Sequence, residues 1–537
     1  MIIPYGADNA SYHVNLIFEN VPKYVFSAVG NSMVMCGLAC DIIVSIERKW
    51  TKERFDAMKI AVCLMMSAML AVVGAKAEGT VDFKVGYAKV DITPKIGTTL
   101  SGYYSRRVSD GVLDPLYARC VAVSDGSAKA LIMTIDNVHL VNSVFMDVRK
   151  AVSDKTGVPL DAVFLACTHT HAGPVSRVPS TKGNASHWEK VHQEDIPVIE
   201  ASNRQIAKGC AKAASDALAD LASATMMMGR GEAKGISFIR RYRMKDGTVR
   251  TNPGMGNPGI ECPLGEPDKQ LQLVRFVRDG KREIAMINFQ CHPDTIGGNK
   301  FSADWPGLAC TYLERAMDGT VDAILINGAQ GDTNHLRVKK APGEVIPNRY
   351  EMAKHMGRVV AGSALSVWGT CAPAKVGKVQ ATVCQVKALT NKGRPEEIPL
   401  AEKYVNLHLS GRGREIPGVG MEHTANVAAA YRMLELKDTP EEVEVPVSVV
   451  AIGDSLAFGG FPGEPFTWIG TELKNRSPFT MTFPACCVNG QRGYFPVKSA
   501  YTDGGYENAT SRFKPGIAER LVDGAVAQLQ EFHSRVK

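Results

Sequence analysis

Two histidines one residue apart follow a short apolar run in "VFLACTHTHAGP", residues 163–174. If that run is a strand that continues through them, His169 and His171 point to the same face, because side chains alternate along a strand. Neighbouring imidazoles suit a metal ion, an acid/base pair or an anionic substrate group. Histidines at strand ends often do no more than hydrogen-bond the backbone, so the pair alone leaves these readings open.

Two further residues have the types that complete a metal site. His292 closely follows the apolar run "IAMINFQ" and precedes Pro293, which holds the loop extended, and Glu464 lies in the turn "FPGEPF". A catalytic zinc ion typically takes three histidine or carboxylate ligands and keeps one position for water. His169, His292 and Glu464 could supply that set from three strand ends, although spacing alone does not bring them together.

Strand-like and helix-like segments alternate from residue 81 onward, which predicts an α/β fold with a single large catalytic domain. Strands are expected at 84–94, 162–167, 283–291, 321–328 and within 448–464, and as a hairpin over 118–137 that turns at Asp125-Gly126. Helices are expected at 143–157, 199–221, 349–368, 424–435, 467–474 and 516–532, the first of them ending at Gly157.

Four polar loops that contain glycine follow the expected strands: "THTHAGP", "CHPDTIGG", "NGAQGDTNH" and "FPGEPFT". Functional sites of α/β proteins form at such strand ends. The chemistry of the protein is therefore expected where these four loops meet.

The first 77 residues differ from the rest of the chain. Residues 58–77 have the pattern of a secretory signal peptide, with a lysine, an apolar stretch and the small-residue site Ala75-Lys76-Ala77. We therefore expect residues 1–57 to be a mis-assigned upstream extension, residues 78–537 to form the catalytic domain, and the protein to be secreted or periplasmic. A membrane segment at 24–46 is the alternative, weakened by its glycine, asparagine and aspartate residues.

Charge and cysteine content exclude two classes of function. The net charge of +7 comes from 62 basic and 55 acidic residues spread along the chain, without the basic face that a nucleic-acid partner requires. The 13 cysteines include no CxxC pair, which excludes a thiolate zinc cluster. Scattered cysteines in a chain of this length are expected to be buried apolar residues, although export would permit disulfides.

The motifs "VGYAKVDITP", "ACTHTHAGP", "CHPDTIGG", "FSADWPG", "GAQGDTN" and "FPGEPFT" occur in the order found in the neutral/alkaline ceramidase family, which the chain resembles from about residue 85 to 507. The resemblance implies a zinc amidohydrolase that cleaves the N-acyl amide of ceramide into sphingosine and a fatty acid with water activated by the metal. It implies two histidines, a glutamate and a tyrosine as zinc ligands, which in this sequence are His169, His292, Glu464 and Tyr494.

The same resemblance implies further catalytic residues. They are His171, Arg240 in "SFIRRYRMKDG" with Arg241 as the alternative one position away, and Tyr506 in "GGYE", twelve positions after Tyr494. A phenol near zinc can act as a weak ligand or donate to a developing oxyanion. Without the resemblance, each tyrosine would be interpreted as half-buried packing and each arginine as surface charge.

Two features depart from the family. Asn334 stands where the ceramidases have a serine; an asparagine cannot be an acyl-transfer nucleophile, but it can hydrogen-bond water or an oxyanion. Nearby Asp332 is interpreted as a turn cap rather than as an acid. The ceramidases continue into an immunoglobulin-like domain, which is expected to be absent because only 31 residues follow Tyr506. The preference for a lipid substrate is therefore open.

Three other functions remain as alternatives to a ceramidase. One is a zinc hydrolase of a different amide or an ester, and another is a non-catalytic glycan- or lipid-binding descendant. A metal-bearing TIM barrel would place the HxH pair after its first strand, whereas several strands and a helix precede it here. The expected partner is a small-molecule or lipid amide, with transient contact to a membrane surface; the oligomeric state is open.

Overall fold

A computed structural model describes residues 82–536 apart from 179–190 and 340–344, and four strands within residues 1–81. These strands form an antiparallel sheet in the order β1-β2-β3-β4: His13–Leu16, Tyr24–Val29, Ser32–Cys36 and Ile42–Ser45. They belong to a unit distinct from residues 81–537. The predicted signal peptide at 58–77 lies outside the described residues. Among the helices that are described, none is long and apolar enough to cross a membrane.

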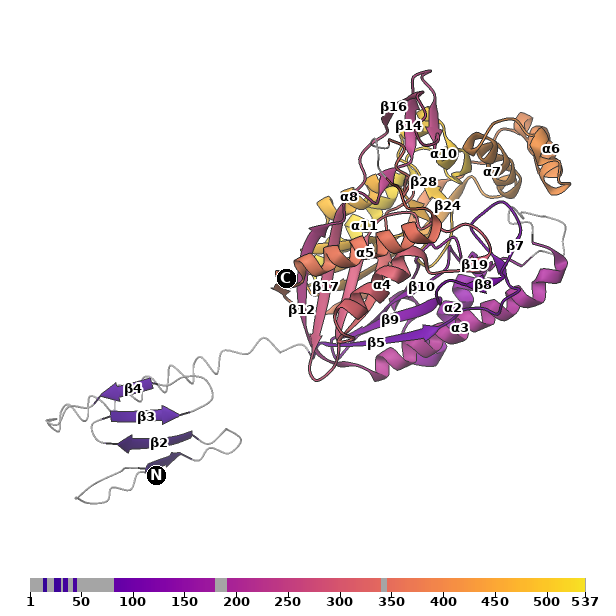
Figure 1. The fold of residues 1–537 in the computed structure, drawn as a ribbon. Helices are drawn as coiled ribbons and strands as arrows, with labels where there is room; N and C mark the ends of the chain where they lie inside the picture. The colour runs from indigo at the N-terminus through magenta and orange to yellow at the C-terminus, as the bar shows by residue number, and fades with distance from the viewer. Residues whose placement is uncertain are drawn as a thin grey trace, which may run out of the picture. The chain divides into compact units, whose positions relative to one another are not determined.

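The larger unit is built on a nine-stranded mixed sheet (Figure 1). Its main order is β11-β10-β9-β5-β12-β17-β18-β20, with β22 paired to β12. In chain order the strands are β5 Lys84–Asp91, β9 Tyr117–Ser124, β10 Lys129–Ile135, β11 Val163–Cys167, β12 Ala222–Glu232, β17 Gln270–Arg278, β18 Glu283–Phe289, β20 Val321–Asn327 and β22 Ala372–Ala374. The predicted hairpin is the antiparallel pair β9–β10.

A second, four-stranded sheet has the order β23-β24-β25-β27. Its strands are β23 Val379–Leu389, β24 Glu442–Ile452, β25 Leu456–Gly460 and β27 Met481–Ala485. Short strands complete the chain: β6 Thr99–Leu100, β7 Arg107–Val108, β8 Gly111–Val112, β13 Phe238–Ile239, β14 Arg241–Met244, β15 Val249–Thr251, β16 Ile260–Pro263, β19 Lys300–Phe301, β21 Thr333–Asn334, β26 Glu464–Pro465 and β28 Tyr494–Phe495.

The described helices are α2 Asn142–Thr156, α3 Ile196–Ala219, α4 Asp304–Ala316, α5 Arg349–Trp368, α6 Ile398–Leu409, α7 Met421–Leu436, α8 Thr467–Arg476, α9 Ala500–Asp503, α10 Tyr506–Thr510 and α11 Ile517–Ser534. All six predicted helices are present. The first ends at Gly157, whose φ of 72° is in the left-handed region that glycine adopts without strain. The sequence did not predict α4 and α6, nor the short helices α9 and α10.

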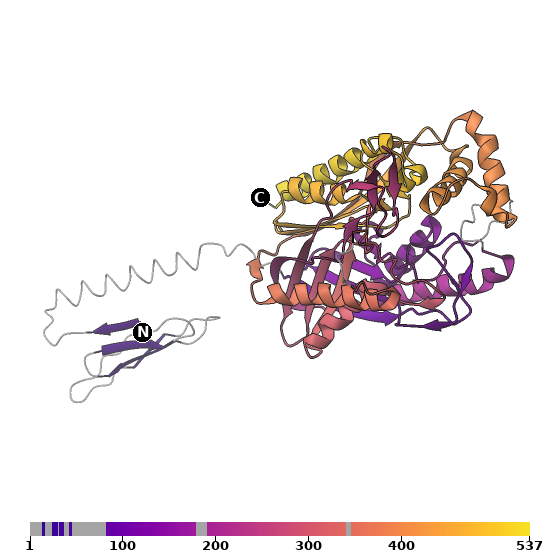
Figure 2. The same cartoon turned by 45° about the horizontal axis from the view of Figure 1, so that its top comes forward.

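Helices and sheets stack in layers, which Figure 2 shows from a second direction. Alternation along the strands explains the order of the layers, because neighbouring residues pack into different cores. In β18, Ile284 packs in the core between the two sheets and Ala285 in the core beneath α4 and α5. In β24, Val449 packs against α11 and Val450 in the inter-sheet core. Both sheets thus pack on two faces, which explains the nearly continuous apolar runs of β9, β10 and β18.

The ten cysteines of residues 82–536 are all free thiols. Eight of them are buried, which confirms the interpretation of these residues as small apolar core positions.

Candidate metal centre

The ends of parallel strands from both sheets meet at one place. Asn327, the last residue of β20, accepts a backbone hydrogen bond from Cys486 N beyond β27 at 2.9 Å. Its buried side-chain amide donates to Thr168 O and to Cys291 O, both at 3.1 Å. Each of these carbonyls immediately precedes a histidine of the predicted site. One asparagine therefore ties the two histidine loops together.

The histidine pair is not placed as a strand would place it. β11 ends at Cys167, and His169 has a φ of 72°, in the left-handed region. The expectation that strand alternation aligns the pair is therefore wrong. The rings nevertheless meet: the ring centroids of His169 and His171 lie 5.2 Å apart, and His292 lies 4.6 Å from the former and 5.2 Å from the latter. These three histidines form a cluster that could bind a metal ion.

Backbone carbonyls fix which nitrogens point into the cluster. His169 Nδ1 lies 2.7 Å from Val138 O, and His292 Nδ1 lies 3.3 Å from Gln330 O. A carbonyl only accepts, so each Nδ1 carries the proton and each Nε2 presents a lone pair. The two Nε2 atoms lie 3.1 Å apart. Two lone pairs at this distance repel one another unless a cation lies between them.

Glu464 brings a carboxylate to the same point. Its Oε2 lies 3.3 Å from His169 Nε2 and 3.6 Å from His292 Nε2, and this buried oxygen accepts no hydrogen bond from the described residues. Burial raises the pKa of the carboxyl. His169, the hydroxyl of Tyr494 and Arg240 act in the opposite direction and lower the pKa to about 2, so the group is ionised at neutral pH. Two imidazole nitrogens and one carboxylate oxygen thus converge.

The two predicted tyrosines lie beside this carboxylate. β26 and β28 pair in parallel with Glu464 opposite Tyr494, whose hydroxyl hydrogen-bonds the carboxylate. The rings of Tyr494 and Tyr506 meet edge to face with centroids 5.7 Å apart. The Tyr506 hydroxyl lies 3.0 Å from that of Tyr104, a residue that the sequence reading did not single out. Burial raises the pKa of Tyr506 to about 12, so its hydroxyl is a proton donor at neutral pH.

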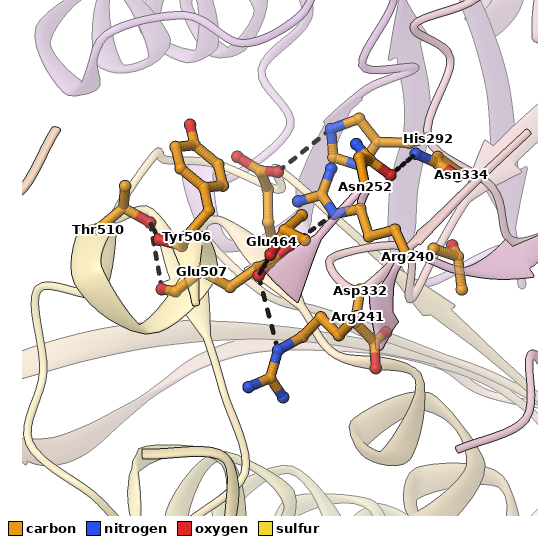
Figure 3. A network of polar contacts seen from close by, with 12 residues as sticks. Arg240, Arg241, Asn252, His292, Asp332, Asn334, Glu464, Tyr506, Glu507 and Thr510 are labelled. Atoms are coloured by element: carbon orange, nitrogen blue, oxygen red, sulfur yellow. Dashed lines mark hydrogen bonds and ion pairs between the residues drawn. The ribbon is translucent and has the colours of Figure 1, made fainter. Parts of the chain in front are cut away.

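The structure separates the two candidate arginines (Figure 3). Arg240 extends toward His292 and lies with its guanidinium carbon 5.3 Å from the ring centre of Tyr494. Arg241 points away and donates to Gly504 O at 2.8 Å. Both arginines share the buried carboxylate of Glu507, at 2.7 Å from Arg240 Nε and 3.6 Å from Arg241 Nε. Arg240 is therefore the arginine at the site, and Glu507 positions it.

Asn334 and Asp332 have structural partners. The buried amide of Asn334 donates to Asn252 Oδ1 at 2.7 Å and its oxygen accepts from Leu336 N at 3.0 Å. Asp332 Oδ1 accepts from Thr467 N at 2.7 Å and from its hydroxyl at 2.8 Å, which caps the first turn of α8. Asp332 therefore acts as a cap, as expected, and the group it caps is the start of α8.

A cavity of about 120 Å³ opens beside the cluster. Its lining includes His169, His171, Glu464, Tyr494 and Tyr506, together with a second group of residues: Arg177, Tyr431, Arg432, Glu435 and Arg512. His292, Arg240 and Asn334 are not among the lining residues. Neither ring nitrogen of His171 has a hydrogen-bond partner in the described part of the chain, and burial together with His169 lowers its pKa to about 4. His171 therefore faces the cavity as a neutral imidazole.

Comparison with known proteins identifies the class. The chain belongs to the neutral/alkaline non-lysosomal ceramidase family, whose N-terminal domain model matches residues 83–402. The family resemblance drawn from the motifs is thereby confirmed. The matched segment contains His169, His171, Arg240, His292 and Asn334, whereas Glu464, Tyr494 and Tyr506 lie beyond it.

Two solved structures share the mixed α/β fold. The neutral ceramidase from Pseudomonas aeruginosa superposes with a TM-score of 0.62 at 18% identity, covering 84% of this chain and 75% of its own. A ceramidase complexed with C2 superposes with a TM-score of 0.61 at 17% identity, covering 84% and 76%. Comparison with curated proteins gave no match. At this identity the structures establish the fold of the larger unit, and the reaction must be argued from the site.

Proposed function

We propose that the protein is a zinc-dependent hydrolase of N-acyl amides. The main support is that two imidazole nitrogens and one carboxylate oxygen converge. The Nε2 atoms of His169 and His292 lie 3.1 Å apart, and Glu464 Oε2 lies 3.3 Å from the first and 3.6 Å from the second. With both Nδ1 protons facing backbone carbonyls, all three atoms can act as acceptors, and one cation between them would satisfy all three. Neutral imidazoles with one carboxylate are the donor set of catalytic zinc sites, and Tyr494 is the proposed fourth ligand.

A zinc ion bound there supplies a Lewis acid for the carbonyl and lowers the pKa of water. The chain's own groups supply the rest. Arg240 and the Tyr506 hydroxyl provide positive charge and a donor where the amide carbonyl oxygen would gain negative charge. His171, a neutral imidazole facing the cavity, is placed to take a proton from the attacking water and pass it to the leaving amine, which departs poorly as an anion. Asn334 has no part in this scheme because its amide is already hydrogen-bonded.

The amide that family membership favours is ceramide, cleaved into sphingosine and a fatty acid. Hydrolysis of another amide or an ester would use the same groups. A binding protein without catalysis would have no physical need for an ionised carboxylate buried beside two lone pairs. Export through residues 58–77 and contact with a membrane surface remain parts of this proposal.

The test is hydrolysis of a fluorogenic ceramide by the full chain, with metal content measured on the same sample. We expect about one zinc ion per chain and fatty-acid release that stops when a chelator removes the metal and resumes when zinc is restored. Full activity in metal-free protein would contradict the proposal. If a zinc-loaded sample does not hydrolyse ceramide, the substrate is another amide or an ester.

A further inference from the structure

The loop between β6 and β7 contacts two of the groups that the proposed function assigns to the chemistry. Gly102 lies against His171: a Cβ added at Gly102, whose φ is 105°, would lie 2.8 Å from His171 Cβ. The ring of Tyr103 meets the ring of His171 edge to face, with centroids 5.5 Å apart. The hydroxyl of Tyr104 lies 3.0 Å from that of Tyr506. One loop therefore touches both the proposed proton carrier and the proposed donor to the carbonyl oxygen.

Contacts on both sides hold this loop in place. Arg107, the first residue of β7, donates through Nη2 to Ser101 O and, at 2.7 Å, to His171 O. Its guanidinium carbon lies 4.4 Å from the ring centre of Tyr103, a distance at which a cation is attracted to an aromatic face. The ring of Tyr104 packs against the apolar cluster between α6 and α7. The position of the Tyr104 hydroxyl is therefore set by the packing of its ring.

The pair of hydroxyls decides where the single proton of Tyr506 can go. Tyr104 and Tyr506 line the cavity together with Glu464, and of two hydroxyls 3.0 Å apart one donates and the other accepts. If Tyr506 donates to the carbonyl oxygen of a substrate, its proton is no longer available to Tyr104, so the proton of Tyr104 must point to Tyr506. A hydrogen bond that a hydroxyl accepts strengthens the one that it donates. This gain is largest in the transition state, where the carbonyl oxygen becomes negative.

We propose that Tyr104 is a positioning residue for the hydrolysis: its hydroxyl donates to Tyr506 and thereby directs the proton of Tyr506 to the carbonyl oxygen of the bound amide. The inference rests on the proposed function. In this arrangement Tyr104 does not contact the carbonyl oxygen, so it acts through Tyr506 alone. Its loss should lower kcat and leave KM nearly unchanged, because the two hydrogen bonds strengthen only as charge develops on the carbonyl oxygen.

The test is a double-mutant cycle on the full chain loaded with zinc, with whichever of two fluorogenic amides, a ceramide or an N-octanoyl aminocoumarin, the wild-type protein hydrolyses. Tyr506→Phe should lower kcat about a hundredfold, the usual loss for one donor to an oxyanion. Tyr104→Phe should lower kcat about tenfold with KM within about twofold of wild type, and should change nothing further in the Tyr506→Phe background. An equal loss in both backgrounds would show that Tyr104 does not act through Tyr506.

Tyr87→Phe is the matched control for the loss of a tyrosine hydroxyl. The buried hydroxyl of Tyr87 donates to Ala323 O at 3.0 Å and does not line the cavity, so kcat should stay at the wild-type value. A loss of kcat in Tyr87→Phe as large as that in Tyr104→Phe would reduce the role of Tyr104 to general stabilisation of the fold and overturn the inference.

Binding of octylphosphonate, whose tetrahedral anionic head resembles the intermediate of amide hydrolysis, separates this inference from the proposed function. Calorimetry on zinc-loaded protein should show binding about tenfold weaker in Tyr104→Phe than in wild type, and no further loss in the Tyr506→Phe background. Amide hydrolysis with an unchanged kcat in Tyr104→Phe would overturn the inference and leave the proposed function intact. Hydrolysis of neither amide, with the phosphonate effect present, would count against the proposed function alone. Hydrolysis of neither amide, with the phosphonate bound equally by wild type and Tyr104→Phe or by neither, would overturn both.

Discussion

The two sides of the cavity are built differently. We call His169, His292 and Glu464 the metal side; their side chains are only 1–6% exposed, and backbone carbonyls fix both rings. We call four other residues that line the cavity, Arg177, Arg432, Glu435 and Arg512, the arginine side. There Arg512 and Glu435 are 30% and 18% exposed, and other side chains hold them. The metal side comes from strand ends and the arginine side largely from α7 and a C-terminal loop. The fold thus holds the proposed reacting groups rigidly and leaves the side chains of the arginine side more adjustable.

The largest expected effect comes from removing a ligand on the metal side. His292→Ala should lower kcat/KM by about a thousandfold or more and abolish tight zinc binding, because it removes one of the two Nε2 lone pairs that converge with Glu464 Oε2. Zinc content and rate are measured on the same sample, and circular dichroism checks the fold. His355→Ala, which removes an exposed histidine on α5, should change neither. Full zinc content and full activity in His292→Ala would show that the metal side does not bind the catalytic metal.

A smaller effect tests whether rigidity itself matters. A Cβ added at Gly331 would lie 2.5 Å from Glu464 O and 2.9 Å from Pro465 O, so Gly331→Ala must displace the strand that carries the carboxylate. Displacement by about 1 Å should lower kcat about a hundredfold. Gly362→Ala is the control, because a Cβ there meets nothing within 4 Å. Wild-type kcat in Gly331→Ala would show that the metal side is as adjustable as the arginine side.

Glu507 connects Arg240 to the rest of the protein. Glu507→Gln leaves a buried guanidinium without its carboxylate, which should lower the free energy of unfolding by about 3 kcal/mol and kcat by about tenfold. Urea unfolding measures the first and steady-state rates the second. Loss of stability with no change in kcat, in both this variant and Arg240→Lys, would make the pair structural only. Glu531→Gln, which removes the 52%-exposed partner of Arg535, should change stability by less than about 0.5 kcal/mol.

The sequence predicted what depends on residue type and on motif order. It predicted six helices and four polar loops after apolar strands, and it placed His169, His292 and Glu464 in those loops as candidate ligands, although spacing alone did not bring them together. It did not predict what backbone atoms do: the carbonyls of Val138 and Gln330 that fix the two rings have no signature in side-chain type. The left-handed φ of His169 also contradicted the strand model of the pair.

Long-range juxtaposition was the other limit. Arg432 and Arg512 are separated by 79 intervening residues and read as ordinary surface charges in the sequence. Only the fold shows them lining one cavity. Asn327 likewise reads as the polar end of a strand, whereas its amide bridges two loops that are more than 120 residues apart. The helix α4 was missed because Pro306 interrupts its pattern, yet proline in a first turn removes no helical hydrogen bond.

The smallest effect is expected from a carboxylate outside the cavity. Asp220 is partly buried, which raises its pKa, but Lys281, Tyr87 N and Arg278 outweigh burial and lower the pKa below its usual value. A lowered pKa in the folded state stabilises the protein above the unfolded-state pKa of about 4, and this stability is lost as pH falls through the folded-state pKa. Asp220→Asn should therefore lower the free energy of unfolding by about 1 kcal/mol at pH 7 and by less at pH 3, with kcat/KM unchanged at pH 7. Urea titrations of both proteins at the two pH values measure this. An equal loss at both pH values would mean that Asp220 stabilises the protein through hydrogen bonding rather than through its charge. A lower kcat/KM would mean that the position of the metal side also depends on contacts at the far end of the sheet.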